Sequence, residues 1–286
     1  MKKKKILLLG ASSSLGKIFL RESNLNEIQG TYNKNKVGKS IFFDSIRSDI
    51  SQLRIVWDNF SHAIILIGDT DPNSCIKDPE LSNKLNILSI KRIIDFLSSK
   101  NIFIIFTSSE FVFDGKSGLY SESDSAEPIL LYGKQKLQIE NYLEKIDNHC
   151  ILRLAKMYDD FDDSTLFLNW KNSIKENKVI NCANDQFFSP LYTNDVVKIT
   201  KIIVENNVSG LFHLSCGKRF RRDELLEVFC KTLKVKPEIN LCSINDFNLP
   251  EERPLDVSLN SNKITRLLDI KFTDTESYIK KHFTEK

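Results

Sequence analysis

Short runs of consecutive apolar residues, separated by stretches with helical periodicity, dominate the first half of the chain. Six such runs are Lys5–Leu9, Ile28–Tyr32, Ser40–Phe43, Ala63–Ile67, Ile102–Phe106 and Ile151–Leu154. Because the runs do not alternate with polar residues, they are typical of parallel strands buried on both faces. The helices that connect such strands are predicted at Leu15–Ser23, Glu80–Ser99 and Leu131–Lys145. The pattern predicts an α/β fold with a doubly wound parallel sheet.

The second half of the chain has a looser pattern and is expected to form a smaller lobe. Loops are predicted at Gly118–Pro128 and Phe161–Ser164, and a helix at Arg222–Leu233. A chain of 286 residues exceeds the usual size of one domain but is short for two independent ones. We therefore expect the sheet domain in residues 1–160 and a mixed α/β lobe in residues 161–286, with some segments of the lobe returning to the sheet.

The composition excludes several classes of protein. Hydrophobic residues make up 41% and charged residues 28% of the chain, which indicates neither disorder nor a membrane protein. A net charge of +3 is too small to favour nucleic acid as a partner. The apolar segment Ile6–Leu9 that follows the Lys2–Lys5 run is too short for a signal peptide. No segment reaches the ~20 apolar residues needed to span a membrane.

The cysteines and histidines favour a reducing compartment and no metal. Six cysteines are scattered without a Cys-x-x-Cys pair, and the four histidines are isolated. We expect reduced, mostly buried thiols and a cytoplasmic location.

A glycine-containing turn follows the first predicted strand and precedes the first predicted helix. In a dinucleotide-binding turn of this kind the first glycine allows a tight turn, the last allows close packing of the helix, and the helix N-terminus offers N–H groups to a pyrophosphate. Ser13 stands in the place of the middle glycine, and its Cβ narrows the approach to a phosphate. A plain strand-to-helix turn is the alternative. The predicted cofactor contacts in this turn are Gly10, Ser12, Ser13, Leu15 and Gly16.

The residues after the second predicted strand favour NADP over NAD. An acidic residue roughly 20 positions beyond the glycine turn would bind the ribose 2′-hydroxyl of NAD. This chain has Asn33 and Lys34 there, followed by Lys36, and the ammonium groups would attract a 2′-phosphate. NADPH or NADP is the expected cofactor, with NADH as a second choice; solvated loop lysines are the alternative. Asp44 would either accept a hydrogen bond from the adenine amino group or hold a turn.

Tyr132 and Lys136 lie four residues apart in a predicted helix, so their side chains share one face. A phenol with a pKa near ~10 is a poor proton donor or acceptor at neutral pH, and a nearby positive charge lowers that pKa. Tyr132 would then protonate a carbonyl oxygen as a hydride reaches the carbon. Taken alone, the spacing also suits an ordinary surface pair.

The sequence around these residues resembles the extended short-chain dehydrogenases, and among them the dTDP-4-dehydrorhamnose reductase-like family. The stretches that carry the resemblance are Ile104-Ile-Phe-Thr-Ser-Ser-Glu-Phe-Val-Phe-Asp-Gly115, Tyr120-Ser-Glu122, Pro128, Tyr132-Gly-Lys-Gln-Lys136, Arg153, Asp185-Gln-Phe-Phe-Ser-Pro190, Gly210-Leu-Phe-His-Leu214 and Arg253-Pro254. The resemblance covers nearly the whole chain. It implies a Rossmann fold with an NADP-binding domain at residues 1–160 and a substrate lobe at residues 161–286.

The resemblance also implies roles for single residues. Ser109 would hydrogen-bond the substrate carbonyl, and Lys136 would hold the nicotinamide ribose as well as tune Tyr132. Asn86 would support Lys136 through a water molecule, and Gly68 would contact the cofactor. The substrate contacts that we expect are Glu110, Phe111, Lys156 and Arg253, the last binding a diphosphate.

Two departures from the family pattern concern the substrate and the cofactor. Lys156 stands where the family has an aromatic residue, which removes a stacking partner for a sugar or base. Asp69 brings a carboxylate to a position that has small residues in the family.

The predicted function is NADPH-dependent reduction of a keto group on a nucleotide-activated deoxysugar, in polysaccharide or deoxysugar biosynthesis, by a chain that forms a homodimer. Related dehydratases need a pair of acid–base residues after the catalytic Ser or Thr, and here Glu110 is followed by Phe111. Related epimerases hold NAD with an acidic residue that this chain lacks. The alternative from another class is a non-catalytic NADP-binding subunit resembling the regulatory subunit of methionine adenosyltransferase.

Overall fold

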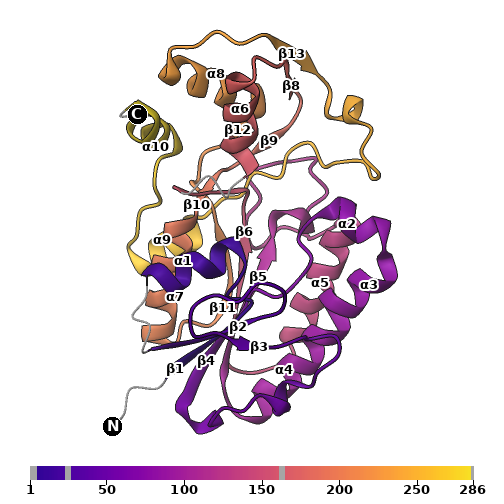
Figure 1. The fold of residues 1–286 in the computed structure, drawn as a ribbon, viewed down its shortest axis with the longest axis vertical. Coiled ribbons are helices and arrows are strands. Elements are labelled where there is room, and N and C mark those ends of the chain that lie inside the picture. The colour runs from indigo at the N-terminus through magenta and orange to yellow at the C-terminus, as the bar shows by residue number, and fades with distance from the viewer. Residues whose placement is uncertain (1–4, 23–26, 161–164, 285–286) are drawn as a thin grey trace. The chain divides into compact units, whose positions relative to one another are not determined.

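Figure 1 shows the computed structural model of the chain, which describes residues 5–22, 27–160 and 165–284. The expected loop Phe161–Ser164 and the lysines at positions 2–4 lie outside the described residues. The chain divides into two compact units that interleave along the sequence. Unit 1 comprises Met1–Ser109, Leu130–Arg153 and Val197–Leu211, and unit 2 comprises Glu110–Ile129, Leu154–Val196 and Phe212–Lys286. The expected boundary at residue 160 stays a prediction.

A seven-stranded sheet is the centre of the fold, and it confirms the predicted doubly wound α/β architecture. Its strands, in spatial order, are β11 (Gly210–Leu214), β6 (His149–Leu154), β5 (Phe103–Ser109), β4 (Phe60–Ile65), β1 (Lys5–Leu9), β2 (Ile28–Tyr32) and β3 (Ile41–Phe42). The pairs of β1 with β2 and β4, of β2 with β3 and of β4 with β5 are parallel. The chain order reverses on either side of β1, which is where α/β sheets bind ligands at the carboxyl ends of their strands.

The central strands of the sheet are buried on both faces, as the continuous apolar runs predict. All seven residues of β5 are buried, and so are Leu7, Leu8 and Leu9 of β1. Within unit 1, α4 (Ile90–Ser99) and α5 (Leu131–Leu143) lie on one side of the sheet and α1 (Ser14–Glu22) on the other (Figure 1). The remaining helical elements of this part are α2 (Pro72–Lys77), α3 (Pro79–Asn83), a π-helix (Lys84–Ser89) and the 3₁₀ turns Ile50–Gln52 and Trp57–Asn59. Helix α7 (Thr193–Asn206) begins in unit 2 and belongs to unit 1 from Val197 onwards.

Unit 2 combines short strand pairs with helices around an aromatic core. β7 (Met157–Tyr158) pairs with β10 (Leu191–Tyr192), β8 (Ile180–Ala183) with β13 (Ile239–Cys242), and β9 (Phe187–Phe188) with β12 (Phe220–Arg221), the last pair being antiparallel. Its helical elements are α6 (Thr165–Lys175), α8 (Arg222–Leu233), α9 (Asn262–Leu268), α10 (Thr275–Thr284) and the 3₁₀ turns Glu110–Val112 and Ile244–Phe247. Phe167, Trp170 and Phe229 pack together in its core.

The state of the cysteines and the hydropathy of the helices can be compared with what the composition predicts. All six cysteines are free thiols, four of them buried, as expected. Among the described helices, none has the length and hydropathy needed to cross a bilayer.

A buried ion pair joins α5 to β6 inside unit 1. The Arg153 guanidinium donates from Nε and Nη2 to the Glu140 carboxylate at 3.1 and 2.7 Å, and both side chains are 5% exposed or less. The Ser108 hydroxyl on β5 donates to the same carboxylate. Glu140 therefore joins its helix to two neighbouring strands at once.

Removing one partner of this pair should destabilise the protein strongly. Arg153→Met keeps much of the side-chain volume but leaves the Glu140 carboxylate buried without its counter-charge. We expect a loss of about 3–5 kcal/mol in the free energy of unfolding, measured by urea denaturation. Lys231→Met is the matched control, because Lys231 pairs with Glu227 at 2.7 Å on an exposed face. That change should cost at most about 1 kcal/mol. Equal losses in the two variants would contradict the prediction.

Candidate functional site

The glycine turn has the geometry that its sequence predicts. Gly10 has φ +94°, a conformation that side chains with a Cβ rarely adopt. A Cβ on Gly16 would lie 2.5 Å from the Gly10 carbonyl oxygen, so the first turn of α1 packs directly on the loop. Thr31 on β2 fixes this loop, because its carbonyl and hydroxyl oxygens accept the Ala11 and Gly10 N–H groups. The turn can hold a pyrophosphate at the end of β1.

Ser13, which stands in the place of the middle glycine, has a local structural role. Its hydroxyl donates to the Gly10 carbonyl at 2.8 Å and accepts the Gly16 N–H at 3.1 Å. The serine thus caps the N-terminus of α1 and closes the turn. Ser12 is half-buried beside it, whereas the Leu15 side chain is buried in the core.

The candidate 2′-phosphate contacts lie on the surface at the end of β2. Asn33, Lys34 and Lys36 are all exposed. Asp44, after β3, accepts the N–H groups of Ile46 and Arg47 at 3.0 and 3.2 Å. These bonds favour the turn role of Asp44 over a contact with the adenine, since one carboxylate oxygen is already engaged.

The π-helix places Asn86 beside the end of β4. The Asn86 side chain accepts the Asp69 N–H at 2.8 Å and donates to the Asp69 carbonyl at 3.0 Å. It also donates to the Gln135 Oε1 atom at 2.7 Å. A Cβ on Gly68 would lie 3.1 Å from Asn86 Oδ1, so the loop approaches the side chain closely. Asn86 therefore shapes the loop after β4, and its support of Lys136 through water stays a prediction.

Tyr132 and Lys136 lie one turn apart on α5, and both are buried. The Lys136 Nζ atom lies 5.7 Å from the centroid of the Tyr132 ring and 4.7 Å from that of Phe106. It donates a hydrogen bond of 2.8 Å to the carbonyl oxygen of Thr107, two residues before Ser109 on β5. Lys136 therefore links the turn of α5 that carries Tyr132 to the strand that ends at Ser109.

The charge on Lys136 depends on its surroundings. Burial lowers the pKa of Lys136 to about 8, although the Glu140 carboxylate one turn further along α5 opposes that decrease. The ammonium is present at neutral pH and is lost as the pH rises above about 8. A buried cation next to a phenol is a suitable arrangement for lowering the pKa of that phenol.

Glu110 and Lys156 meet inside unit 2. The Lys156 backbone N–H donates to Glu110 Oε2 at 3.1 Å, and Glu110 is 4% exposed. Burial raises the pKa of Glu110 to about 8, against the opposing effect of the Lys156 ammonium and backbone N–H. Phe111 packs against the aromatic core of the unit. Glu110 is therefore mostly a neutral acid at pH 7, able to donate a proton.

Arg253 is buried in unit 2, and its Nη1 donates to the Glu251 carbonyl at 3.1 Å. The neighbouring Pro254 packs on Gly115, where a Cβ would lie 2.4 Å from the proline Cβ. The segment that carries Arg253 is thus fixed in place.

Sequence reasoning missed three side chains that position the site. Glu140 follows Lys136 by four residues, so the same spacing that relates Tyr132 to Lys136 was sufficient to find it. Gln135 is buried, and its amide donates to Ser82 Oγ and Asn83 Oδ1. Thr31 carries no pattern that distinguishes it from other strand threonines.

Known proteins of similar sequence and structure share the doubly wound α/β fold described above. The profile of the family described as RmlD substrate binding domain matches residues 4–286. The beta subunit of methionine adenosyltransferase 2 from Xenopus laevis is 25% identical over 224 residues, which cover 74% of this chain and 67% of that protein.

Solved structures of similar fold include two dTDP-4-dehydrorhamnose reductases. A hypothetical one from Sulfolobus tokodaii has a TM-score of 0.85 and 24% identity, covering 96% of this chain and 98% of that one. The Bacillus anthracis enzyme, solved in complex with NADP, has a TM-score of 0.84 and 19% identity, covering 99% and 100% of the two chains.

The buried Glu110 carboxyl should make stability depend on pH. Its pKa of about 8 in the fold lies above the value of about 4.3 in an unfolded chain. The contribution of the protonated Glu110 carboxyl to the free energy of unfolding is therefore complete below about pH 4, and it is lost as the pH rises towards 8. Relative to Glu110→Gln, the free energy of unfolding of the wild type should fall between pH 5 and pH 8. Glu176→Gln, at an exposed position, is the control and should follow the wild type. Parallel pH profiles for Glu110→Gln and the wild type would refute a raised pKa.

Proposed function

The chain belongs to the RmlD substrate binding domain family, and on this premise we propose that it is an NADPH-dependent reductase of a keto group on a nucleotide-activated sugar. The observation that carries the proposal is the buried pair of Tyr132 and Lys136, linked through Thr107 to the strand that ends at Ser109. We expect the protein to act as a homodimer in the cytoplasm, in deoxysugar or polysaccharide biosynthesis.

The proposed reduction gives a distinct task to each of Ser109, Tyr132 and Lys136. NADPH, when bound, supplies the hydride. Negative charge develops on the carbonyl oxygen of the substrate, and Ser109 stabilises it by donating a hydrogen bond. Tyr132 transfers its proton to that oxygen, and the Lys136 ammonium stabilises the phenolate that is left.

The proposed cofactor contacts are distributed over the ends of four strands. The pyrophosphate would lie at the loop between Gly10 and Gly16, and the 2′-phosphate beside Lys34. Lys136 would also hold the nicotinamide ribose, next to the loop that Asn86 fixes. The remaining proposed contacts are Ser12, Ser13, Leu15, Asn33, Asp44 and Gly68. The NADP complex of the Bacillus anthracis reductase supports this choice of cofactor, with NADH as a second choice.

The proposed substrate contacts belong to unit 2. Arg253 would bind the diphosphate, because a guanidinium suits bidentate recognition of phosphate. Glu110, Phe111 and Lys156 would contact the sugar, with Glu110 as a neutral hydrogen-bond donor. Lys156 in place of an aromatic residue indicates a sugar that carries hydrogen-bond acceptors.

A non-catalytic NADP-binding subunit is the second candidate. It is favoured by the match to the beta subunit of methionine adenosyltransferase 2. A subunit of this kind would bind NADPH without oxidising it in the presence of any nucleotide-linked keto sugar. The intact Ser109 and Tyr132 favour the enzyme, because both are assigned to the substrate carbonyl and NADPH binding alone does not require them.

Tyr132→Phe tests the mechanism, since it keeps the ring and removes only the acidic proton. The rate of single-turnover NADPH oxidation should fall about 10²–10⁴-fold, while NADPH still binds. The substrate is found first by incubating nucleotide-linked keto sugars with NADPH and identifying products by mass. A Tyr132→Phe variant with the wild-type rate would exclude Tyr132 as the acid.

Replacing both Lys34 and Lys36 by alanine tests the cofactor preference. NADPH should bind the wild type more tightly than NADH. The double variant should lose much more affinity for NADPH than for NADH, because only NADPH carries the 2′-phosphate. Isothermal titration with the two cofactors gives both dissociation constants. Equal weakening would show that these lysines do not bind the phosphate.

A further inference from the structure

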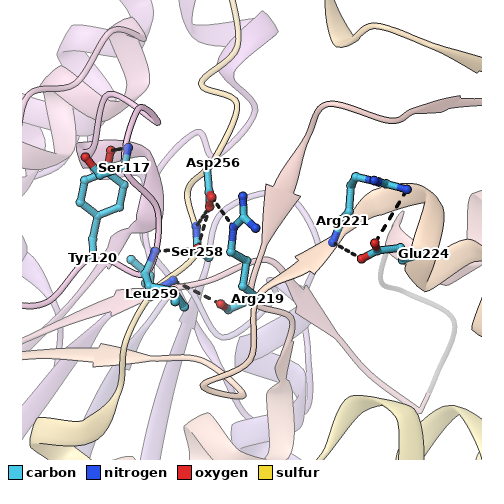
Figure 2. A network of polar contacts seen from close by, with 10 residues as sticks. Ser117, Tyr120, Arg219, Arg221, Glu224, Asp256, Ser258 and Leu259 are labelled. Atoms are coloured by element: carbon cyan, nitrogen blue, oxygen red, sulfur yellow. Dashed lines mark hydrogen bonds and ion pairs between the residues drawn. The ribbon is translucent and has the colours of Figure 1, made fainter.

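Two arginines at the start of β12, Arg219 just before the strand and Arg221 within it, are held in different ways. The Arg221 guanidinium donates from both Nε and Nη2 to the Asp223 carboxylate, at 2.5 and 2.8 Å. Arg219 donates from Nε alone to Asp256 Oδ2, at 2.5 Å. Figure 2 shows Arg219 against Asp256 and Arg221 turned to Glu224. The Arg219 side chain remains 42% exposed, and within the described residues no other hydrogen bond of its guanidinium is found.

The carboxylate that holds Arg219 is itself fixed. The N–H and the hydroxyl of Ser258 donate to Asp256 Oδ1 at 3.1 and 2.6 Å. The Asp256 N–H donates to the Gly115 carbonyl at 3.0 Å. A Cβ on Gly118, which has φ +70°, would lie 2.2 Å from Asp256 Oδ2, so this loop leaves room only for glycine. Asp256 therefore presents one oxygen to Arg219 in a defined direction.

An aromatic ring fixes the plane of the same guanidinium. The Arg219 Cζ atom lies 3.6 Å from the centroid of the Phe187 ring. The Phe187 backbone is bonded on both sides, since its N–H donates to the Leu255 carbonyl and its carbonyl accepts the Val257 N–H. Stacking on the ring and the bond from Nε leave Arg219 little rotational freedom.

This arrangement differs from that of arginines with a purely structural role. Arg153 and Arg221 each use two nitrogens on one carboxylate, which is the strongest geometry for an ion pair. Arg219 directs only one nitrogen at Asp256, so its Nη edge is oriented but not used by that contact. A guanidinium held in advance loses less entropy when it binds a phosphate.

We propose that Arg219 binds the diphosphate of a nucleoside diphosphate-linked substrate through its Nη groups, with Asp256 and Phe187 as its positioning residues. This rests on the proposed function, in which the substrate is a nucleotide-activated sugar. Arg219 would bind the diphosphate in addition to Arg253, which is buried and bonded through Nη1 to the Glu251 carbonyl. Arg219 would recognise the diphosphate by its charge and by the fork geometry of the guanidinium. We therefore expect it to bind nucleoside diphosphates whatever their base.

The experiment measures binding without turnover. The full chain is titrated calorimetrically with dTDP, UDP, GDP and CDP, and with the matching nucleosides. For the diphosphates that bind, Arg219→Gln should raise the dissociation constant about 10- to 100-fold, the usual effect of losing hydrogen bonds to a charged group. Arg219→Lys keeps the charge but not the fork and should give an intermediate value. Nucleoside binding should not change.

Arg221→Gln is the matched control, because Arg221 lies two residues further along the chain and both of its fork nitrogens bond to Asp223. It should bind each diphosphate as the wild type does. Equal affinities of Arg219→Gln and the wild type, equal weakening in both arginine variants, or no diphosphate binding by the wild type would overturn the proposal. NADPH oxidation by Tyr132→Phe tests the reductase function separately, so binding that depends on Arg219 would stand even if that function failed.

Discussion

The buried contact between Arg153 and Glu140 is the interaction on which the site in unit 1 depends. It joins α5 to β6, while Ser108 joins the same carboxylate to β5. The rotation of α5 about its axis is thereby fixed, and every side chain on that face is fixed with it. Lys136 and Tyr132 precede Glu140 by one and two turns. Burying this ion pair costs desolvation energy, but the pair fixes the positions of Tyr132 and Lys136, which are proposed to act in the reduction.

Burial acts in opposite directions on two ionisable groups of this protein. It lowers the pKa of Lys136 and raises that of Glu110, each to about 8. Both groups therefore carry a proton at neutral pH, although one is charged and the other is not. Environments that shift pKa values towards the working pH are typical of functional sites. Arg219 differs from both groups, because an arginine stays charged and its guanidinium is oriented by contacts with Asp256 and Phe187.

The sequence was sufficient to predict the elements that local patterns encode. The strand Lys5–Leu9 and the helix Arg222–Leu233 have the predicted bounds, and the shared face of Tyr132 and Lys136 follows from helical spacing. Contacts made across long sequence separations were beyond such reasoning. Asp256 follows Arg219 by 37 positions, and no periodicity relates them. The π-helix also escaped prediction, because its turn is set by tertiary contacts of Asn86 rather than by composition.

The interleaving of the two units has a consequence for synthesis on the ribosome. Unit 1 receives its last segment, Val197–Leu211, only after much of unit 2 has been made. Domains generally fold as units, N-terminal first, as the chain emerges. Here neither unit is complete until most of the chain has left the ribosome. Any premature stop before residue 211 leaves both units unfinished, and β6 then lacks β11, its neighbour at the edge of the sheet.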